Sequence, residues 1–276
     1  IEFVSSPHYP AALQGNLLVG NVIGFQGILQ YAFKPSAESY PEAVEVEPLL
    51  SSSDPNFRPA DLEFGPDGAL YFCDWQNPII GHMQHNLRDP SRDRIHGRVY
   101  RVVMDGKPVA KPTPIAGRSV TELVALLSDP IDRVRYRARL ELSGRPETEV
   151  VPAVQAWLAK LDPKGPDYQH QVVEALWTLR HFDQVPLELL DKVLGLEDPR
   201  ARTAGMRVLA SIADRVPAAL DLVRKAAADE SPRVRLEAVR TASYLKVPEA
   251  VEALAIVGEF PSDRQMDYVK KEAARV

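Results

Sequence analysis

Short apolar runs bounded by turn residues characterise the first hundred residues of the chain. They predict strands over residues 16–20, 28–33, 44–50, 60–64, 70–74 and 98–103. Gly65-Pro66-Asp67-Gly68 separates two of these runs, and Pro and Gly in such a stretch favour a tight turn. We therefore expect an antiparallel hairpin here, in a fold of short, evenly spaced strands such as a sandwich, a barrel or a propeller.

The period of the apolar positions changes after the proline-rich stretch 107–117. Ala, Leu, Val, Arg and Glu then recur at helical spacing, and similar segments open at Asp129-Pro130, Asp198-Pro199 and Ser231-Pro232. Proline fits the first turn of a helix, and the Asp or Ser before it can cap that helix. A helix pair that repeats every 33–36 residues is typical of HEAT-like solenoids, whose repeats stack into a continuous core.

These two patterns divide the chain into three parts. We expect residues 1–106 to form the last blades of a β-propeller, residues 107–117 a Pro-rich linker, and residues 118–276 HEAT-like helical repeats. Six strands are too few to close a propeller of four-stranded blades. The first residue is Ile1, and the last amphipathic pattern has no capping Gly or Pro. The sequence is therefore expected to be part of a longer protein.

Composition and charge exclude several classes of protein. The 276 residues carry 33 basic and 38 acidic side chains, a net charge of -5, whereas proteins that coat nucleic acid are usually basic. No apolar stretch approaches the roughly 18 residues of a membrane span, so we expect neither a nucleic-acid partner nor a membrane span. The single cysteine, Cys73, excludes an internal disulfide and a cysteine-rich metal cage, and its apolar strand predicts that it is buried.

The densest group of polar residues lies between two predicted strands, over residues 73–98. It holds three of the six histidines, four arginines and three aspartates, and long loops of this kind are often functional. The histidines are candidate acid–base groups or metal ligands, and the arginines would stabilise negative charge. The alternative is that these side chains pair locally and only hold the loop on the sheet. The candidate catalytic residues are His82, His85, Arg94, His96 and Arg98.

Four residues near this loop are candidates for substrate binding, namely Asp61, Asp74, Trp75 and Asn77. The indole of Trp75 can stack on a ligand or cover an edge of the core. The two aspartates can line a central channel or cap turns. His82-x-x-His85 lacks the nearby Glu that would complete a zinc-protease motif, so no metal site is assigned.

Arginines recur in the helical part at equivalent repeat positions. They suggest either a basic stripe for an acidic partner or nucleic acid, or Arg–Asp pairs along the stack of repeats. Acidic residues are interleaved with the arginines, which favours the pairing interpretation. The arginines are Arg133, Arg135, Arg137, Arg139, Arg200, Arg202, Arg233, Arg235 and Arg240.

Several long motifs in residues 1 to about 105 carry a resemblance to a known family. Residues 57–75 contain the Gly-Pro-Asp-Gly turn, and residues 77–85 read Asn-Pro-Ile-Ile-Gly-His-Met-Gln-His. Residues 96–102 read His-Gly-Arg-Val-Tyr-Arg-Val, and residues 15–31 begin Gly-Asn-Leu-Leu-Val-Gly-Asn. Together with the repeats behind them, these motifs resemble the planctomycete-type (PVC) membrane-bound dehydrogenase or haem-binding proteins.

The resemblance implies a propeller related to glucose/sorbosone dehydrogenases, then HEAT-like repeats, then a cytochrome c domain with a Cys-x-x-Cys-His haem site. The present chain has no Cys-x-x-Cys-His, so no cofactor is expected within it. Haem c would belong to the cytochrome domain of the same polypeptide, and pyrroloquinoline quinone (PQQ) or calcium to the complete propeller. The family also implies a periplasmic or cell-envelope location.

Two functions follow as hypotheses from these observations. In the first, the longer protein is a cell-envelope oxidoreductase acting on a carbohydrate or a small alcohol. A histidine such as His82 or His85 would take the hydroxyl proton while hydride leaves for the cofactor. The alternative is a non-catalytic propeller–HEAT module that binds polysaccharide or a protein partner. The present chain alone is expected to show no turnover.

Overall fold

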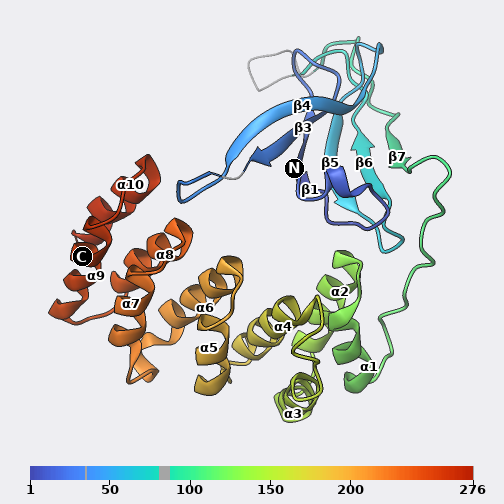
Figure 1. Cartoon of the computed structure of the whole chain (residues 1–276). Helices are drawn as coiled ribbons and strands as arrows, with labels where there is room; N and C mark the ends of the chain where they lie inside the picture. The colour runs from blue at the N-terminus through green and yellow to red at the C-terminus, as the bar shows by residue number, and fades with distance from the viewer. Residues whose placement is uncertain (35, 81–87, 276) are drawn as a thin grey trace. The chain divides into compact units, whose positions relative to one another are not determined.

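The computed structural model describes residues 1–34, 36–80 and 88–275 (Figure 1). The chain divides into two compact units. The first unit gathers Ile1–Lys34, Glu42–Gly117 and Asp129–Ala138, and the second unit contains the rest of the described chain. The first unit holds the antiparallel β-sheets, and the second holds most of the helical residues.

Four strands of the first unit form one antiparallel sheet in chain order. Leu17 pairs with Tyr31 and Leu18 with Gln30, so alternate side chains of neighbouring strands share a face. A short 3-10 helix, η1 (Ala11–Leu13), lies between the first two strands. The strands are β1 (Glu2–Phe3), β2 (Leu17–Asn21), β3 (Gly27–Lys34) and β4 (Glu42–Ser51).

Three further strands, β5 (Pro59–Phe64), β6 (Leu70–Asp74) and β7 (Arg98–Val102), form a second antiparallel sheet. The expected hairpin is confirmed, because Phe64 pairs with Leu70 across the turn. Gly68 has a φ of 81°, in the left-handed region that glycine adopts at little cost. Both sheets are open in the described residues, and no closed propeller is present among them.

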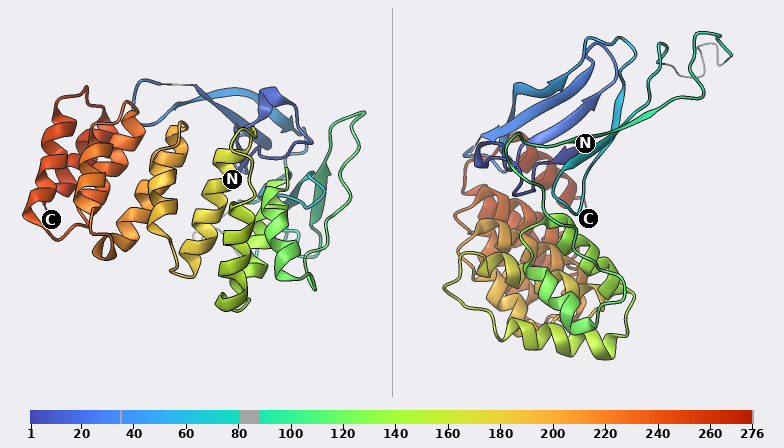
Figure 2. Two further views of the ribbon diagram at one scale, coloured as in Figure 1. Left: turned by 60° about the horizontal axis from the view of Figure 1, so that its bottom comes forward. Right: turned by 90° about the vertical axis from the view of Figure 1, so that its right-hand side faces the viewer.

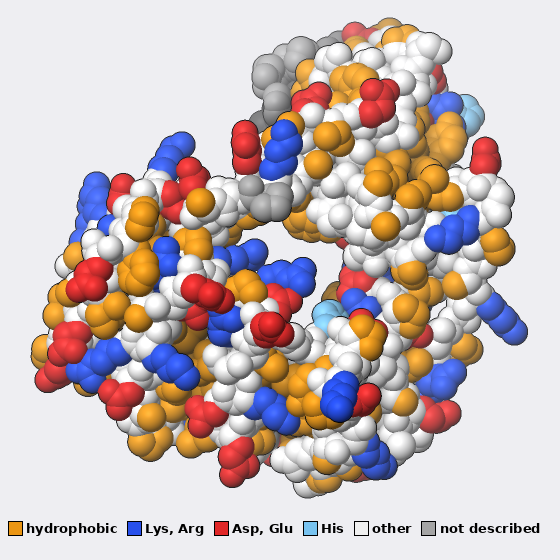
Figure 3. Space-filling model, in the orientation of Figure 1, with side chains coloured by type: hydrophobic (Ala, Val, Ile, Leu, Met, Phe, Trp, Pro, Cys, Tyr) orange, Lys and Arg blue, Asp and Glu red, His pale blue; other side chains and the backbone are white. Residues whose placement is uncertain are grey.

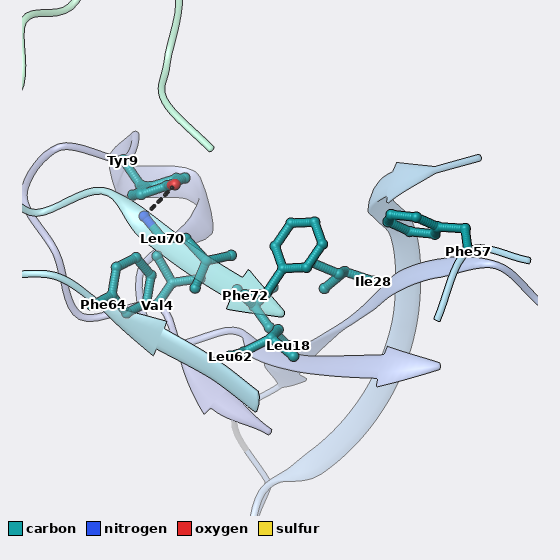
Figure 4. Packing of buried hydrophobic residues seen from close by; sticks show 9 residues of the cluster. All are labelled: Val4, Tyr9, Leu18, Ile28, Phe57, Leu62, Phe64, Leu70 and Phe72. Atoms are coloured by element: carbon teal, nitrogen blue, oxygen red, sulfur yellow. Dashed lines mark hydrogen bonds between the residues drawn. The ribbon is translucent and has the colours of Figure 1, made fainter. Parts of the chain in front are cut away.

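The core of this unit lies between the inward faces of the two sheets (Figure 4). Apolar side chains alternate along the strands, so each sheet turns one apolar face inward. The hydroxyl of Tyr9 accepts a hydrogen bond from the Leu70 N–H at 3.2 Å and donates one to the Val102 carbonyl at 2.9 Å. The core residues are Val4, Tyr9, Leu18, Ile28, Phe57, Leu62, Phe64, Leu70 and Phe72.

Ten α-helices follow the sheets in the described chain, with 3-10 turns η2 (Leu126–Ser128), η3 (Ala213–Arg215) and η4 (Pro248–Val251) between them. The Asp198-Pro199 prediction is confirmed, since Pro199 is the first residue of a helix and Asp198 accepts a hydrogen bond from the Arg200 N–H. The helices are α1 (Val120–Ala125), α2 (Asp132–Ser143), α3 (Glu147–Leu158), α4 (Tyr168–His181), α5 (Leu187–Leu194), α6 (Pro199–Ile212), α7 (Ala219–Ala227), α8 (Pro232–Ala242), α9 (Glu252–Gly258) and α10 (Arg264–Ala273).

These helices pack in a regular order and form a row in the left view of Figure 2. Helix α6 packs against α4 and α8, α8 packs against α10, and α7 packs against α9. Helices α5 and α6 approach each other closely at Gly205 of α6. A Cβ at this position would lie 2.8 Å from the Leu194 side chain of α5, so no larger residue fits without a shift. Each helix buries an apolar stripe against its neighbours, as repeated helix pairs do.

Candidate functional site

The candidate loop begins and ends at two residues that face each other across the second sheet. Asp74 ends β6, Arg98 begins β7, and the two residues are direct partners in the strand register. The Asp74 carboxylate is buried, and its Oδ2 lies 2.8 Å from Arg98 Nε and 2.7 Å from Arg98 Nη2. The strand pairing therefore creates a charged pair at the base of the loop.

The other oxygen of Asp74 ties the neighbouring backbone to this pair. Its Oδ1 accepts hydrogen bonds from the Arg58 N–H at 2.7 Å and from the Gln76 N–H at 2.9 Å. Arg98 also donates to Asp54 Oδ2 at 3.2 Å. The carboxylate thus joins the start of β5, the end of β6 and the start of β7, and its oxygens are engaged by protein donors.

These four charged residues form a group that we call the Asp74 cluster: Asp54, Arg58, Asp74 and Arg98. The Asn56 N–H and then the Arg98 guanidinium hold the pKa of Asp54 below its ordinary value. Arg58 is buried and donates from Nη1 to the Phe57 carbonyl at 3.1 Å. The four charges of the cluster balance, which lowers the cost of placing Asp74 and Arg58 inside the protein.

Trp75 and Asn77 follow the cluster and have different environments. The Trp75 N–H donates to the Arg58 carbonyl at 3.0 Å, while 47% of the Trp75 surface is exposed. Asn77 is buried, and its side chain donates to the Asp93 carbonyl at 3.2 Å and accepts from the Ile79 N–H at 3.2 Å. Asn77 therefore holds the loop, whereas Trp75 presents its indole to solvent from a fixed backbone.

The described histidine of the loop, His96, pairs locally. Its Nδ1 lies 2.9 Å from Asp93 Oδ2, and its side chain is 75% exposed. The N–H groups of Ile95 and His96, followed by the His96 ring, hold the pKa of Asp93 below its ordinary value. Arg94 is exposed, and its side chain also interacts with another group of the protein.

The remaining candidates are not gathered around His96. His82 and His85 lie outside the described residues. Asp61 is exposed at an irregularity of β5, where its φ is 52°, and no hydrogen bond or ion pair joins it to Asp74 in the described parts of the chain. Of the nine candidates, the structure brings the side chains of Asp74 and Arg98 together, and Trp75 is joined to their cluster through its backbone N–H.

The expectation that Cys73 is buried is wrong, because this residue is exposed. Side chains alternate along β6, and Leu70, Phe72 and Asp74 point inward. Cys73 therefore lies on the opposite face, beside its strand partner Val99, which is 74% exposed. The apolar run indicated a strand correctly but gave the wrong face for this residue.

The sequence analysis missed Asp54 and Arg58 as members of the site. The available signal was the Arg58-Pro59 step immediately before an apolar strand, which places a charged residue next to the core. A polar stretch before a strand is usually solvated, so this signal is weak.

Arg202 has the pairing role that the interleaved charges favoured, whereas Arg235 bonds backbone carbonyls. Arg202 forms two hydrogen bonds with Asp229, at 2.8 and 2.9 Å, and donates to the Leu196 and Glu197 carbonyls. Arg235 occupies the equivalent place in the next pair and donates to the Asp229 and Glu230 carbonyls. On the face in Figure 3, side chains of both charges are interspersed over the helices.

Buried glutamates accept hydrogen bonds from arginines that lie two helices earlier in the chain. Arg207 on α6 lies 2.8 Å from Glu237 on α8, and Arg139 on α2 lies 2.5 Å from Glu174 on α4. Burial of Glu174 would raise its pKa, but the hydrogen bond from His170 and the Arg139 charge outweigh burial and lower that pKa. These arginines therefore join equivalent helices of neighbouring helix pairs.

The comparison with protein families gives one match, to the family described as "Domain of unknown function (DUF7133)", over residues 2–106. The matched region contains both sheets. No curated protein and no solved structure matches the chain. Among the described residues, no helix has the length and apolar character needed to cross a bilayer.

Proposed function

We propose that the two sheets are consecutive blades of a β-propeller and that the helices form a HEAT-like solenoid, in a protein of the cell envelope. A four-stranded antiparallel sheet in chain order, followed by a sheet that shares its core, supports the first part. The packing of α4, α6, α8 and α10 in succession supports the second. The envelope location rests on the family resemblance.

We further propose that the chain is a binding module whose β part recognises carbohydrate through Trp75. The observation that carries this proposal is a half-exposed indole on a backbone fixed by the Asp74 cluster. A flat aromatic ring offers a large apolar surface to the C–H face of a sugar, and its two χ angles cost little entropy to fix. A rigid base raises affinity, since less ordering is needed on binding.

Exposed polar groups of the Asp74 cluster supply the second requirement of sugar recognition, if the bound sugar extends from Trp75 to them. The side chains of Arg98 and Asp54 are 37% and 36% exposed, so each keeps surface available to solvent. A guanidinium donates and a carboxylate accepts, and together they can bind neighbouring hydroxyl groups. The local pairing of His96 and Asp93 agrees better with a binding surface than with acid–base chemistry.

The substitution Trp75→Ala is the test of this function. The panel comprises neutral and acidic oligosaccharides, with binding measured by titration calorimetry. The Trp75→Ala variant is expected to bind the sugar about tenfold or more weakly than the unaltered chain. A single aromatic side chain often supplies most of the binding free energy of a small interface. Trp177→Ala is the matched control, since Trp177 is 40% exposed on α4 and its loss should leave the affinity unchanged. Equal losses in both variants, or no binding to any sugar, would overturn the proposal.

The second candidate function is oxidation of a carbohydrate or small alcohol by a longer protein, with electrons passing to its cytochrome domain. The family resemblance of residues 1–105 supports it. In the described residues no group of three or more His, Cys, Asp or Glu side chains could hold a metal ion, and the Asp74 oxygens are already engaged. These residues do not fit a calcium site, and we derive no step through calcium or PQQ.

His85→Ala tests this second function in the complete polypeptide. If His85 is the general base, dye reduction with a sugar panel should fall by about a hundredfold or more. The His96→Ala variant is the comparison, because His96 pairs with Asp93 at the surface and should matter less. Equal activity in the unaltered protein and in His85→Ala removes His85 from the reaction.

A further inference from the structure

Two arginines of the helical part share one buried carboxylate. Arg207 Nε on α6 lies 2.8 Å from Oε1 of Glu237 on α8, and Arg240 Nη1, also on α8, lies 3.6 Å from Oε2. The Glu237 side chain is 3% exposed, whereas the side chains of Arg207 and Arg240 are 42% and 39% exposed. The carboxylate therefore lies beneath two guanidinium groups that both reach solvent.

Most donors of these two guanidinium groups have no acceptor in the described chain. Arg207 donates through Nε, and within the described residues the Arg240 guanidinium forms no hydrogen bond. Arg202, five residues before Arg207 on α6, is different, because it is 11% exposed and bonds Asp229 and two backbone carbonyls. Arg207 and Arg240 thus keep N–H groups for an external acceptor.

A third arginine, on α4, continues this group across the helices. Arg180 Nε donates to Oγ of Ser211 at 2.7 Å, and Ser211 stands one turn after Arg207 on α6. Arg180, Arg207 and Arg240 therefore follow one another over α4, α6 and α8, and we call these three residues the arginine strip.

The acidic residues beside the arginine strip do not cancel its charge. Glu237 supplies one carboxylate for two arginines. Asp183 lies 3.5 Å from Arg180 but forms a closer pair with Arg215, at 2.6 Å. The strip keeps a positive surplus, so charge complementarity favours a ligand that carries several anionic groups.

An exposed aromatic ring lies at the α8 end of the arginine strip. Tyr244 is 56% exposed, and Arg240 Cζ lies 5.5 Å from the centroid of its ring. The ring of a tyrosine offers a flat apolar surface, and its hydroxyl can form hydrogen bonds. Such a ring beside a cation suits a ligand in which sugar rings alternate with anionic groups.

We propose that the arginine strip binds a sulfated polysaccharide. One sulfate ester accepts from the unoccupied donors of Arg207 and Arg240, since its three terminal oxygens can meet both guanidinium forks. The adjoining sugar ring packs on Tyr244, and a further sulfate meets Arg180. The choice of a sugar backbone rests on the carbohydrate binding proposed for the β part, whereas the choice of an oxyanion rests on the strip alone.

Dextran sulfate and unsulfated dextran of the same length serve as the probes. They differ only in the sulfate esters, so their comparison isolates the charged contact. Titration calorimetry measures their binding to the whole chain carrying Trp75→Ala, which removes the site proposed for the β part. Saturable binding of dextran sulfate, and none of dextran, is the expected result, and it does not depend on whether Trp75 binds sugar.

Single substitutions locate the contact on the arginine strip. Arg240→Gln should weaken dextran sulfate binding about tenfold or more, because charge-assisted hydrogen bonds are lost. The fold should tolerate this change, since the Arg240 guanidinium makes no hydrogen bond to another described residue. Arg240→Lys keeps the charge but not the fork, and should recover part of the affinity.

Arg224→Gln is the matched control. It removes the same charge from α7, where Arg224 pairs with Glu252 at 2.7 Å and with Asp221 at 2.9 Å. Because these two carboxylates already engage Arg224, its loss should leave the affinity for dextran sulfate unchanged.

The proposal fails on any of three results. The first is absence of saturable binding of dextran sulfate. The second is an equal affinity of Arg240→Gln and Arg224→Gln, which would mean that the ligand senses net charge or binds elsewhere. The third is competition by an oligo-aspartate peptide of equal charge at the same concentration, which would assign the strip to an acidic protein.

Discussion

Asp74→Asn is expected to reduce the free energy of unfolding of the β part by about 1.5–3 kcal/mol, the range for hydrogen bonds to a charged group, because Arg98 is partly exposed and keeps Asp54 as a partner. The amide keeps the size of the carboxylate but removes the charge that faces Arg98. It also cannot accept on both ends the bonds that Arg98, Arg58 and Gln76 now donate. Urea unfolding followed by tryptophan fluorescence and circular dichroism measures the change.

Asp61→Asn is the matched control for this substitution. Asp61 lies on the neighbouring strand β5, is exposed, and has a φ of 52° that asparagine also accepts. Its substitution should change stability by no more than about 0.5 kcal/mol. A loss below about 1 kcal/mol for Asp74→Asn would contradict the central place of this carboxylate in the cluster.

Arg202→Met is expected to destabilise the helical part by about 3 kcal/mol or more, because it leaves a carboxylate without its counter-charge in a largely buried place. The side chains of Arg202 and Asp229 are 11% and 14% exposed. The same change removes the donor for the Leu196 and Glu197 carbonyls. Thermal and urea unfolding of the whole chain measure the effect.

Arg200→Met provides the comparison two residues away on the same helix. The Arg200 side chain is 80% exposed, and its pair with Asp198 is a surface pair, so the loss should not exceed about 1 kcal/mol. Adding Asp229→Asn to Arg202→Met should restore part of the lost stability, since the unpaired charge is then removed. Equal losses for Arg200→Met and Arg202→Met would contradict the structural role of the buried pair.

Local patterns were sufficient for most of the secondary structure. The six predicted strands correspond to β2 to β7, since alternation and turn residues are readable over a few positions. β1 (Glu2–Phe3) was missed, because two residues are too few to show a period. The Asp198-Pro199 and Ser231-Pro232 steps begin α6 and α8, since the fixed φ of proline acts locally. The expected cap forms at Asp198, whereas the side chain of Ser231 makes no capping hydrogen bond.

The site was only partly predictable, because its contacts depend on strand register. Asp74 and Arg98 were candidates from the loop they bound, but their direct pairing follows from the β6–β7 register. A shift of one residue would place the other face inward, which is also why the exposure of Cys73 was missed. Arg58 reaches the cluster through the β5–β6 pairing, which no local pattern around Arg58 encodes.

The most direct test of the account is a crystal structure of the chain with an oligosaccharide that it binds. The expected result is a sugar ring stacked on the indole of Trp75, with its hydroxyl groups bonded to Arg98 and Asp54. The Asp74–Arg98 pair should keep its present geometry, because the proposal gives it a supporting role beneath the binding surface and no part in a reaction. A sugar bound away from an uncovered Trp75, or a complex in which Asp74 leaves Arg98 to contact the sugar, would contradict the account.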